Sequence, residues 1–185
     1  MKKKLKNFEK FHSQLELPFL ETDNKFIKEI FHTLEIQFGL KSNSKQKFID
    51  LGAGNGKVVI YAALNYNIKS YGIEINQNLI NEARLRIKSL KKEGNYNKEL
   101  FKRMNIQLGD FFMLNLKDYD FIYIYSLPSM QEFLKHVFNA VKKGAIIISH
   151  KYSFKGFNLI LKDEYKLSHK NGKHEIYTFF YKRIS

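Results

Sequence analysis

The chain has 185 residues, 44% of them hydrophobic, which predicts one globular domain and excludes a disordered chain. It has no cysteine, so disulfides, thiolate metal sites and cysteine nucleophiles are excluded. A net charge of +14 favours a polyanionic partner, although the basic residues are mostly lysines scattered along the whole chain. No apolar run approaches the roughly 20 residues that span a bilayer, and no signal-peptide core follows the N-terminus, so we expect a cytoplasmic protein.

Short apolar runs alternate with amphipathic segments through most of the chain. We expect a short helix up to about residue 11, and Thr22 or Asp23 is placed to cap a helix through residues 26–34. The pattern then predicts strands at residues 47–51, 69–75, 105–108, 120–125 and 145–150, and helices around residues 58–62, 79–90 and 131–141.

The last part of the chain has a different pattern. Residues 157–165 and 174–181 predict two strands joined by a turn at Asn171-Gly172, a dipeptide typical of hairpins. The sequence therefore predicts an α/β fold with a Rossmann-like seven-stranded sheet, mostly parallel, with an antiparallel C-terminal hairpin and helices on both faces. Residues 1–21 are expected to form a helical leading segment, and residues 22–185 a single domain.

Three alternate glycines, Gly52, Gly54 and Gly56, follow the first predicted strand and are preceded by Asp50. Glycine lets a backbone turn tightly and approach a ligand closely, and the helix that follows presents free N–H groups. A dinucleotide-binding turn has the spacing Gly-x-Gly-x-x-Gly and holds a pyrophosphate, which Asp50 would repel. The ammonium of a methionine moiety would instead be attracted, so the motif predicts S-adenosylmethionine as the cofactor.

Two more acids follow predicted strands. Glu74 ends the second strand, where it is placed to accept hydrogen bonds from both ribose hydroxyls, and Asp110 follows the third, where it is placed to accept from the adenine amino group. Phe111 or Phe112 is placed to pack on the adenine ring. Each residue alone also has an ordinary structural role, as a helix cap or core side chain. Ligands bind at the carboxyl ends of strands in open α/β sheets, so together these residues predict one cofactor site.

The sequence resembles the small seven-strand protein-lysine methyltransferases, a branch of the class I methyltransferases, over about residues 17–183. This family includes archaeal broad-specificity enzymes and mitochondrial enzymes that act on the ATP synthase c-subunit and the adenine nucleotide translocase. The stretches that carry the resemblance are residues 18–22 (PFLET), 50–57 (DLGAGNGK), 72–76 (GIEIN), 127–130 (LPSM) and 148–157 (ISHKYSFKGF). The third stretch implies that Asn76 belongs to the cofactor site.

The resemblance has four departures. Glu21 stands where the family usually has a second proline, Asn55 and Lys57 replace Asp and Arg, and Phe157 replaces Trp. These changes concern substrate choice more than cofactor binding, because the glycines and the acids of the cofactor motifs are all present.

The resemblance implies direct displacement of a methyl group onto the ε-amine of a lysine in a protein substrate. A free lysine has a pKa of about 10.4, and desolvation in a narrow aromatic channel lowers it, so a dedicated strong base is not required. We expect Tyr125, Ser126 and Phe157 to line this channel, with core packing an equal alternative for the two aromatic residues. Thr22 is expected to close over the methionine carboxylate. His150, at a strand end, is interpreted as a hydrogen-bonded residue.

Two other functions stay open. An RNA methyltransferase is the first alternative, because the positive charge suits nucleic acid and ring-nitrogen or ribose methylation needs no special motif. Against it, residues 126–129 (SLPS) lack the amide or acid that nucleobase N-methyltransferases commonly use at this place. A non-catalytic S-adenosylmethionine-binding module is the second alternative. No cluster of His, Asp or Glu has metal-ligand spacing, so no metal is expected.

Overall fold

The computed structural model describes residues 19–185; the expected N-terminal helix and most of the leading segment lie outside the described residues. No helix within residues 19–185 is long and apolar enough to cross a membrane. The α-helices are α2 (Asn24–Phe38), α3 (Lys57–Tyr66), α4 (Gln77–Glu93) and α5 (Leu134–Asn139), and the 3-10 helices are η1 (Lys98–Arg103), η2 (Phe111–Met113) and η3 (Pro128–Phe133). The strands are β1 (Lys47–Leu51), β2 (Lys69–Glu74), β3 (Met104–Leu108), β4 (Phe121–Ile124), β5 (Ile146–His150), β6 (Leu161–Asn171) and β7 (His174–Arg183).

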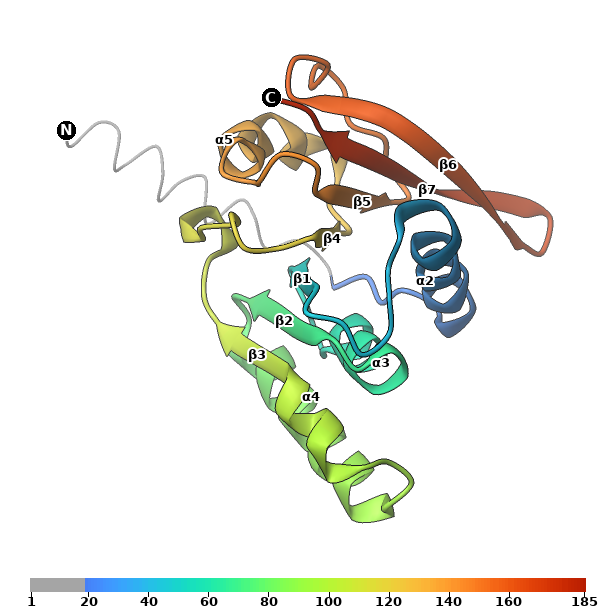
Figure 1. Cartoon of the computed structure of the whole chain (residues 1–185), viewed down its shortest axis with the longest axis vertical. Coiled ribbons are helices and arrows are strands. Elements are labelled where there is room, and N and C mark those ends of the chain that lie inside the picture. The colour runs from blue at the N-terminus through green and yellow to red at the C-terminus, as the bar shows by residue number, and fades with distance from the viewer. Residues whose placement is uncertain (1–18) are drawn as a thin grey trace.

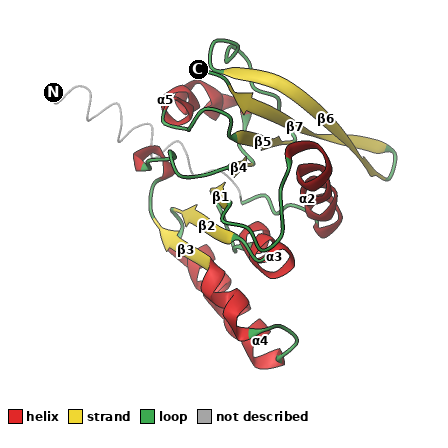
Figure 2. Cartoon of the chain, viewed as in Figure 1, coloured by secondary structure: helices red, strands yellow, loops and turns green. Residues whose placement is uncertain are grey.

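The strands form one seven-stranded sheet in the order β3-β2-β1-β4-β5-β7-β6. The five strands from β3 to β5 are parallel to one another, whereas β7 runs antiparallel to both β5 and β6. The two long strands of this hairpin end the sheet (Figure 2). The fold therefore confirms the predicted mostly parallel sheet with an antiparallel C-terminal hairpin.

Helices cover both faces of the sheet, and α2 and α5 lie on opposite sides of β5 (Figure 1). One apolar core lies between the sheet and the helices α2 and α3, and its members include Phe31, Phe48, Phe121 and Phe180. The other core lies on the opposite face under α5, with Leu134, Phe138, Phe154 and Phe157 among its members. Alternation of side chains along β4 explains this division, because Phe121 and Tyr123 join the first core while Ile122 and Ile124 join the second.

The helices begin and end where the sequence supplies caps. The Asp23 carboxylate accepts a hydrogen bond from the Lys25 backbone N–H at 2.7 Å and starts α2, as one of the two expected caps. Gly39, with φ +70°, ends the same helix. The Asn76 side chain caps α4 in the same way, by accepting from the Asn78 backbone N–H. The N-termini of α2 and α4, which these caps begin, lie at the carboxyl edge of the sheet.

Two predicted elements differ from the structure. The helix predicted over residues 131–141 is the 3-10 helix η3 followed by the short α5, because Pro128 starts a turn three residues before the predicted helix. The strand predicted over residues 157–165 begins only at Leu161 and extends to Asn171. A turn occupies residues 158–160, where the Leu161 N–H donates to the Phe157 carbonyl at 2.8 Å.

The C-terminal hairpin extends beyond the carboxyl edge of the parallel strands. His150, the last residue of β5, pairs with Thr178, and β7 begins four residues earlier, at His174. Asn171 pairs with His174, so the turn is formed by Gly172 and Lys173, one residue later than the predicted dipeptide. Gly172 has φ +60° at the first central position, which fits a type II′ turn.

Candidate functional site

The carboxyl ends of β1, β2 and β3 bring the predicted acids to one edge of the sheet. Asp50 pairs with Gly72 in the register of β1 and β2, and Glu74 pairs with Leu108 in that of β2 and β3. Asp110 follows β3 by two residues and begins η2. Because parallel strands end at the same edge, residues distant in the sequence meet there, as the motif order predicted.

The glycine turn between β1 and α3 requires glycine for its backbone shape. Gly52, Gly54 and Gly56 have φ of +87°, +53° and +76°, in the left-handed region that other residues rarely adopt. At Gly56 a Cβ atom would also overlap the Ile106 side chain, and at Gly54 it would overlap the ring of Phe19. At Gly52 a Cβ would meet no atom within 4 Å, so this glycine faces open space and leaves its backbone accessible to a ligand.

Glu74 is buried and is held by backbone groups. One carboxylate oxygen accepts from the Gly54 N–H at 2.8 Å, and the other accepts from the Asn76 N–H at 2.8 Å. Each oxygen keeps a second lone pair, so acceptance from ribose hydroxyls remains available. The two bonds fix the direction of the carboxylate and join the glycine turn to the start of α4. Asn76 itself uses its side chain to cap α4.

Asp50 is the most unusual acid of this edge. It is 3% exposed, and among residues 19–185 its carboxylate has no hydrogen-bond donor and no cation beside it. Burial, and secondly the nearby Glu74 carboxylate, raise the pKa of Asp50 well above its usual value. Two buried carboxylates so placed form a site of negative potential, and a cationic ligand would relieve both the desolvation and the repulsion.

Asp110 and Phe111 lie beside this edge, in the turn after β3. The Asp110 carboxylate accepts from the Phe112 N–H at 2.8 Å and caps η2. Phe111 is half-buried, packs against the ring of Phe112 with centroids 4.5 Å apart, and contacts the core under α5. The proposed adenine contacts of Asp110 and Phe111 stay predictions.

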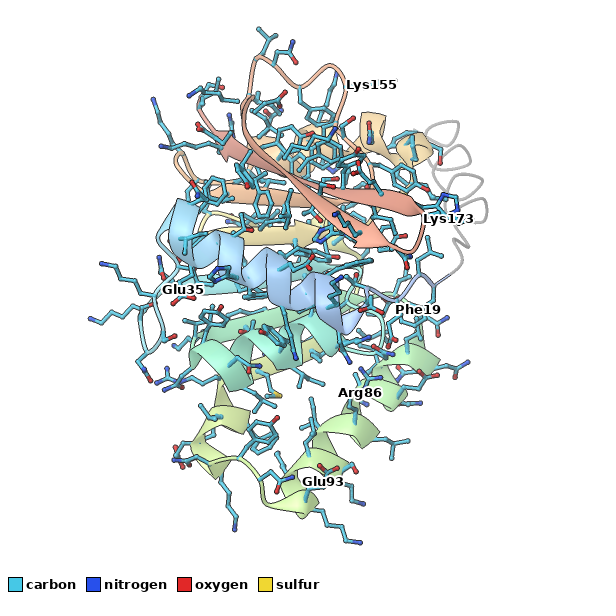
Figure 3. All side chains as sticks on the ribbon, turned by 90° about the vertical axis from the view of Figure 1, so that its right-hand side faces the viewer. Phe19, Glu35, Arg86, Glu93, Lys155 and Lys173 are labelled. Atoms are coloured by element: carbon cyan, nitrogen blue, oxygen red, sulfur yellow. The ribbon has the colours of Figure 1, made fainter. Side chains whose placement is uncertain are left out.

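Residues 19–23, the leading strap, cross the glycine turn. Thr22 is buried, and its hydroxyl lies 2.7 Å from the hydroxyl of Tyr123 on β4. Glu21, where the resemblance implies a proline, accepts a hydrogen bond from the Asn55 amide at 2.6 Å and forms ion pairs with Lys57 and Arg86 at 3.1 and 3.3 Å. These contacts hold the strap against α3 and α4, and Figure 3 labels Phe19 and Arg86 on this side of the molecule.

Three of the four departures noted in the sequence, Glu21, Asn55 and Lys57, thus form one group of contacts. Asn55 and Lys57 replace Asp and Arg of the family, and Glu21 supplies a carboxylate to both of them. The hydrogen bond from Asn55 is the main cause of the lowered pKa of Glu21, and Lys57 and Arg86 add to it against the opposing effect of burial. The contact between these residues was not predicted from the sequence. The signal was a pair of opposite changes from the pattern that the resemblance implies, because Glu21 adds a negative charge and Asn55 removes one.

The three residues expected to line a channel separate in the structure. Tyr125 follows β4 and packs edge-to-face on the His150 ring, with centroids 4.9 Å apart. Ser126 is 3% exposed, and its Oγ is a buried atom without a hydrogen-bond partner. Phe157 lies in the opposite core, against Phe138 and Phe154. Core packing therefore accounts for Phe157, and its channel role stays a prediction, as do those of Tyr125 and Ser126.

A buried polar network beside Tyr125 went unrecognised in the sequence. His150 on β5, Thr178 on β7 and His169 on β6 are each at most 2% exposed, and a hydroxyl joins the two imidazoles. The signal was present as polar residues at inward positions of strands, yet the pairing of the strands decides which of them meet. Among residues 19–185, no group of three or more His, Asp or Glu side chains is placed to hold a metal ion.

S-adenosylmethionine fits this edge of the sheet. It carries a sulfonium and an ammonium charge, which match the buried Asp50–Glu74 pair, and its polar groups can supply a partner for the unpaired Ser126 hydroxyl after β4. The accessible glycine turn leads into the N-terminus of α3, which suits close approach of a ligand. Fold and site together define a class I S-adenosylmethionine-dependent methyltransferase.

Comparison with known proteins narrows this class to a family. The model of the family described as ANTKMT methyltransferase domain matches residues 50–160, more than half of the chain, and the chain belongs to this family. The protein-lysine N-methyltransferase of Saccharolobus islandicus (strain REY15A) is 28% identical over 165 residues, which cover 88% of this chain and 92% of that protein. A lysine N-methyltransferase of Caenorhabditis elegans, named for the c-subunit of ATP synthase, is 26% identical over 167 residues, covering 90% of this chain and 80% of that protein.

Solved structures show the same fold. An RNA methyltransferase from Salinibacter ruber, in complex with S-adenosyl-L-homocysteine, is 22% identical and superposes with a TM-score of 0.65 over 87% of this chain and 93% of that chain. TrmK of M. capricolum, in complex with S-adenosyl-homocysteine, is 20% identical, with a TM-score of 0.59 over 88% and 69%. At these identities the likeness shows the fold alone and does not indicate which molecule accepts the methyl group.

Proposed function

We propose that this chain transfers the methyl group of S-adenosylmethionine to the side-chain amine of lysine in a protein substrate. The observation that carries the proposal is the family match over residues 50–160. Two relatives named as lysine methyltransferases also align with nearly the whole chain. The cytoplasm is the proposed compartment, which the cysteine-free sequence supports.

The residues of the edge would contribute by holding the donor and desolvating the amine. When bound, S-adenosylmethionine supplies an electrophilic methyl group on a positively charged sulfur. Asp50 and Glu74 balance positive charge, the Gly52–Gly56 backbone permits close approach, and Thr22 lies at the N-terminus of α2. Asn76, Asp110 and Phe111 would complete the site around the nucleoside.

The acceptor needs only the right position and protonation state. A lysine ammonium loses a proton more readily in an apolar environment, and the nearby positive sulfur lowers the pKa of the amine further. Tyr125 and Ser126 follow β4 at this edge and would form part of that environment. Transfer forms the bond from the amine nitrogen to the methyl carbon and breaks the bond from that carbon to sulfur.

RNA is the second candidate acceptor. The net charge of +14 favours a polyanion as partner. We rank it second, because the relatives that align over most of the chain at higher identity act on lysine. A binding module without catalysis would retain donor affinity and label no acceptor.

Isotopically labelled S-adenosylmethionine and a mixed cell lysate test the proposal. Label that protease releases and nuclease does not, and that hydrolysis returns as methyl-lysine, is the expected result. Label in RNA would replace the proposal with the second candidate, and tight donor binding with no labelled acceptor would favour the binding module. Glu74→Ala, which removes the acceptor of the Gly54 and Asn76 N–H groups, is the background control.

A further inference from the structure

A continuous hydrogen-bonded chain runs from the carboxyl edge of the sheet to the surface of α2. The His150 Nδ1 atom lies 2.8 Å from the Thr178 hydroxyl, and the same hydroxyl lies 2.7 Å from His169 Nε2. His169 Nδ1 lies 2.5 Å from a carboxylate oxygen of Glu29. The two imidazoles and the threonine are buried, and only Glu29, whose side chain is 36% exposed, reaches solvent.

With a neutral His169, the carboxylate at one end fixes the direction of every hydrogen bond in the chain. A carboxylate only accepts, so a neutral His169 donates from Nδ1 and carries its lone pair on Nε2. The Thr178 hydroxyl donates to that lone pair, and its oxygen accepts from the His150 Nδ1–H. His150 is therefore the tautomer protonated on Nδ1, and its Nε2 carries a lone pair. Among residues 19–185, no donor is bonded to His150 Nε2.

His150 lies on the same face of the sheet as Asp50, one row of side chains further along the strands. The register aligns Asp50 with Tyr123 and Tyr123 with Ile148, all on the face of the sheet covered by α2 and α3. Two residues further along β4 and β5, Tyr125 and His150 form the next row on this face, at the carboxyl edge. The Tyr125 ring packs edge-to-face on His150, which joins the histidine to a residue proposed for the acceptor channel.

We propose that His150 Nε2 accepts a hydrogen bond from the substrate amine and orients its nitrogen toward the donor methyl group. Thr178, His169 and Glu29 act as positioning residues, because they hold His150 in the tautomer that has its lone pair on Nε2. The proposal rests on the proposed function, and it names the contact by which the same site recognises an amine.

Burial supports a neutral acceptor here. Desolvation lowers the pKa of His150 to about 3, and the neighbouring His169 and Lys151 add to this in the same direction. A charged imidazolium would repel both an ammonium and a sulfonium, whereas a neutral ring keeps an acceptor available through the physiological pH range. The acidic and phenolic groups beside this ring are Glu29, beyond His169, and the hydroxyls of Tyr123 and Tyr125.

Nitrogen NMR of the protein labelled with ¹⁵N-histidine and saturated with S-adenosylhomocysteine tests the tautomer. The expected spectrum has His150 protonated on Nδ1, with Nε2 unprotonated, and n-butylamine shifts the Nε2 resonance. Butyltrimethylammonium, which has the same charge and no N–H, is expected to leave Nε2 unchanged. A proton on Nε2 before either compound is added, or an equal response to n-butylamine and butyltrimethylammonium, would overturn the proposal.

Two variants of Thr178 distinguish a role in positioning His150 from a role in folding alone. Thr178→Val removes the bridging hydroxyl, while Thr178→Ser keeps it; Val is expected to abolish the butylamine response and lower turnover about tenfold, and Ser to retain both. Should Thr178→Val fail to fold, the partly exposed Glu29→Ala removes the same anchor, with Glu35→Ala, an exposed glutamate on the same helix, as its control. A Glu29→Ala variant with the wild-type tautomer and turnover contradicts the positioning role.

Different results would overturn the proposed lysine methylation and the proposed amine contact of His150. Label found in RNA, together with a butylamine shift at Nε2, would remove lysine as the acceptor and leave the amine contact standing. Methyl-lysine formed by a protein whose Nε2 ignores butylamine would keep the proposed function and remove His150 from it.

Discussion

Replacing His150 with asparagine is expected to change how the stability of the protein depends on pH. Asparagine keeps a donor near the position of Nδ1 for Thr178 and cannot titrate. In the wild type the folded pKa of His150 is about 3 and the unfolded value 6.5. Between these values the unfolded chain takes up a proton that the folded protein does not, so wild-type stability falls as the pH decreases below 6.5 and is fully present above it.

The expected size follows from the two pKa values. From pH 7.5 to pH 5.0, a histidine with these values removes about 2 kcal/mol from the unfolding free energy. The variant lacks this contribution but loses the volume of a ring that is 2% exposed, so it is expected to be less stable at every pH. The informative quantity is therefore the difference between the two pH dependences, in which contributions shared by both proteins cancel.

Urea unfolding followed by circular dichroism, at half-unit steps from pH 5.0 to 7.5, gives this difference. The wild type is expected to lose about 2 kcal/mol more than His150→Asn over this range. His32→Asn, which changes an exposed histidine on α2, is the control for loss of a histidine in general. Parallel curves for wild type and His150→Asn would refute the reasoning, because they would mean that His150 takes up its proton equally in both states.

Three further results are expected. Glu74→Ala should lower S-adenosylmethionine affinity about 100-fold in calorimetry, because the glycine turn and Asn76 lose a shared acceptor; unchanged affinity would contradict the cofactor site. Gly56→Ala should cost about 1–3 kcal/mol in urea unfolding, more than Gly94→Ala, which has a similar φ but open space; equal costs would exclude the overlap with Ile106. Phe157→Leu should lower stability and spare turnover if Phe157 is core alone, and a selective loss of turnover would restore its channel role.

The parallel half of the fold was predictable from local pattern. Strand β1 has the predicted bounds, and β2 ends one residue before the predicted end, since short buried strands between glycine, polar and helical segments have clear limits. The region from Pro128 to Leu161 was less predictable, because 3-10 turns and a short helix leave no sustained periodicity. There the proline and the turn after Gly156 decided the structure.

The site residues also include some that were predictable from the sequence and some that were not. The glycines and acids that follow strands were found from sequence, because their order along the chain matches their order in the sheet. The Glu29–His169–Thr178–His150 chain was not, since its members come from α2, β6, β7 and β5 and meet only after the last strand inserts beside β5. Non-local pairing of this kind has no signature in the spacing of residues.

The antiparallel hairpin gives this protein a part that can vary independently of the donor site. Its turn, Gly172-Lys173, lies beyond the last pairing of β5 with β7, so residues added or exchanged there alter no strand that carries the glycine motif or its acids. Lengthening a surface loop costs little, about 0.6 kcal/mol for each doubling. Residues at this turn can therefore be exchanged or added while the strands that carry the methyl-donor motifs stay unchanged.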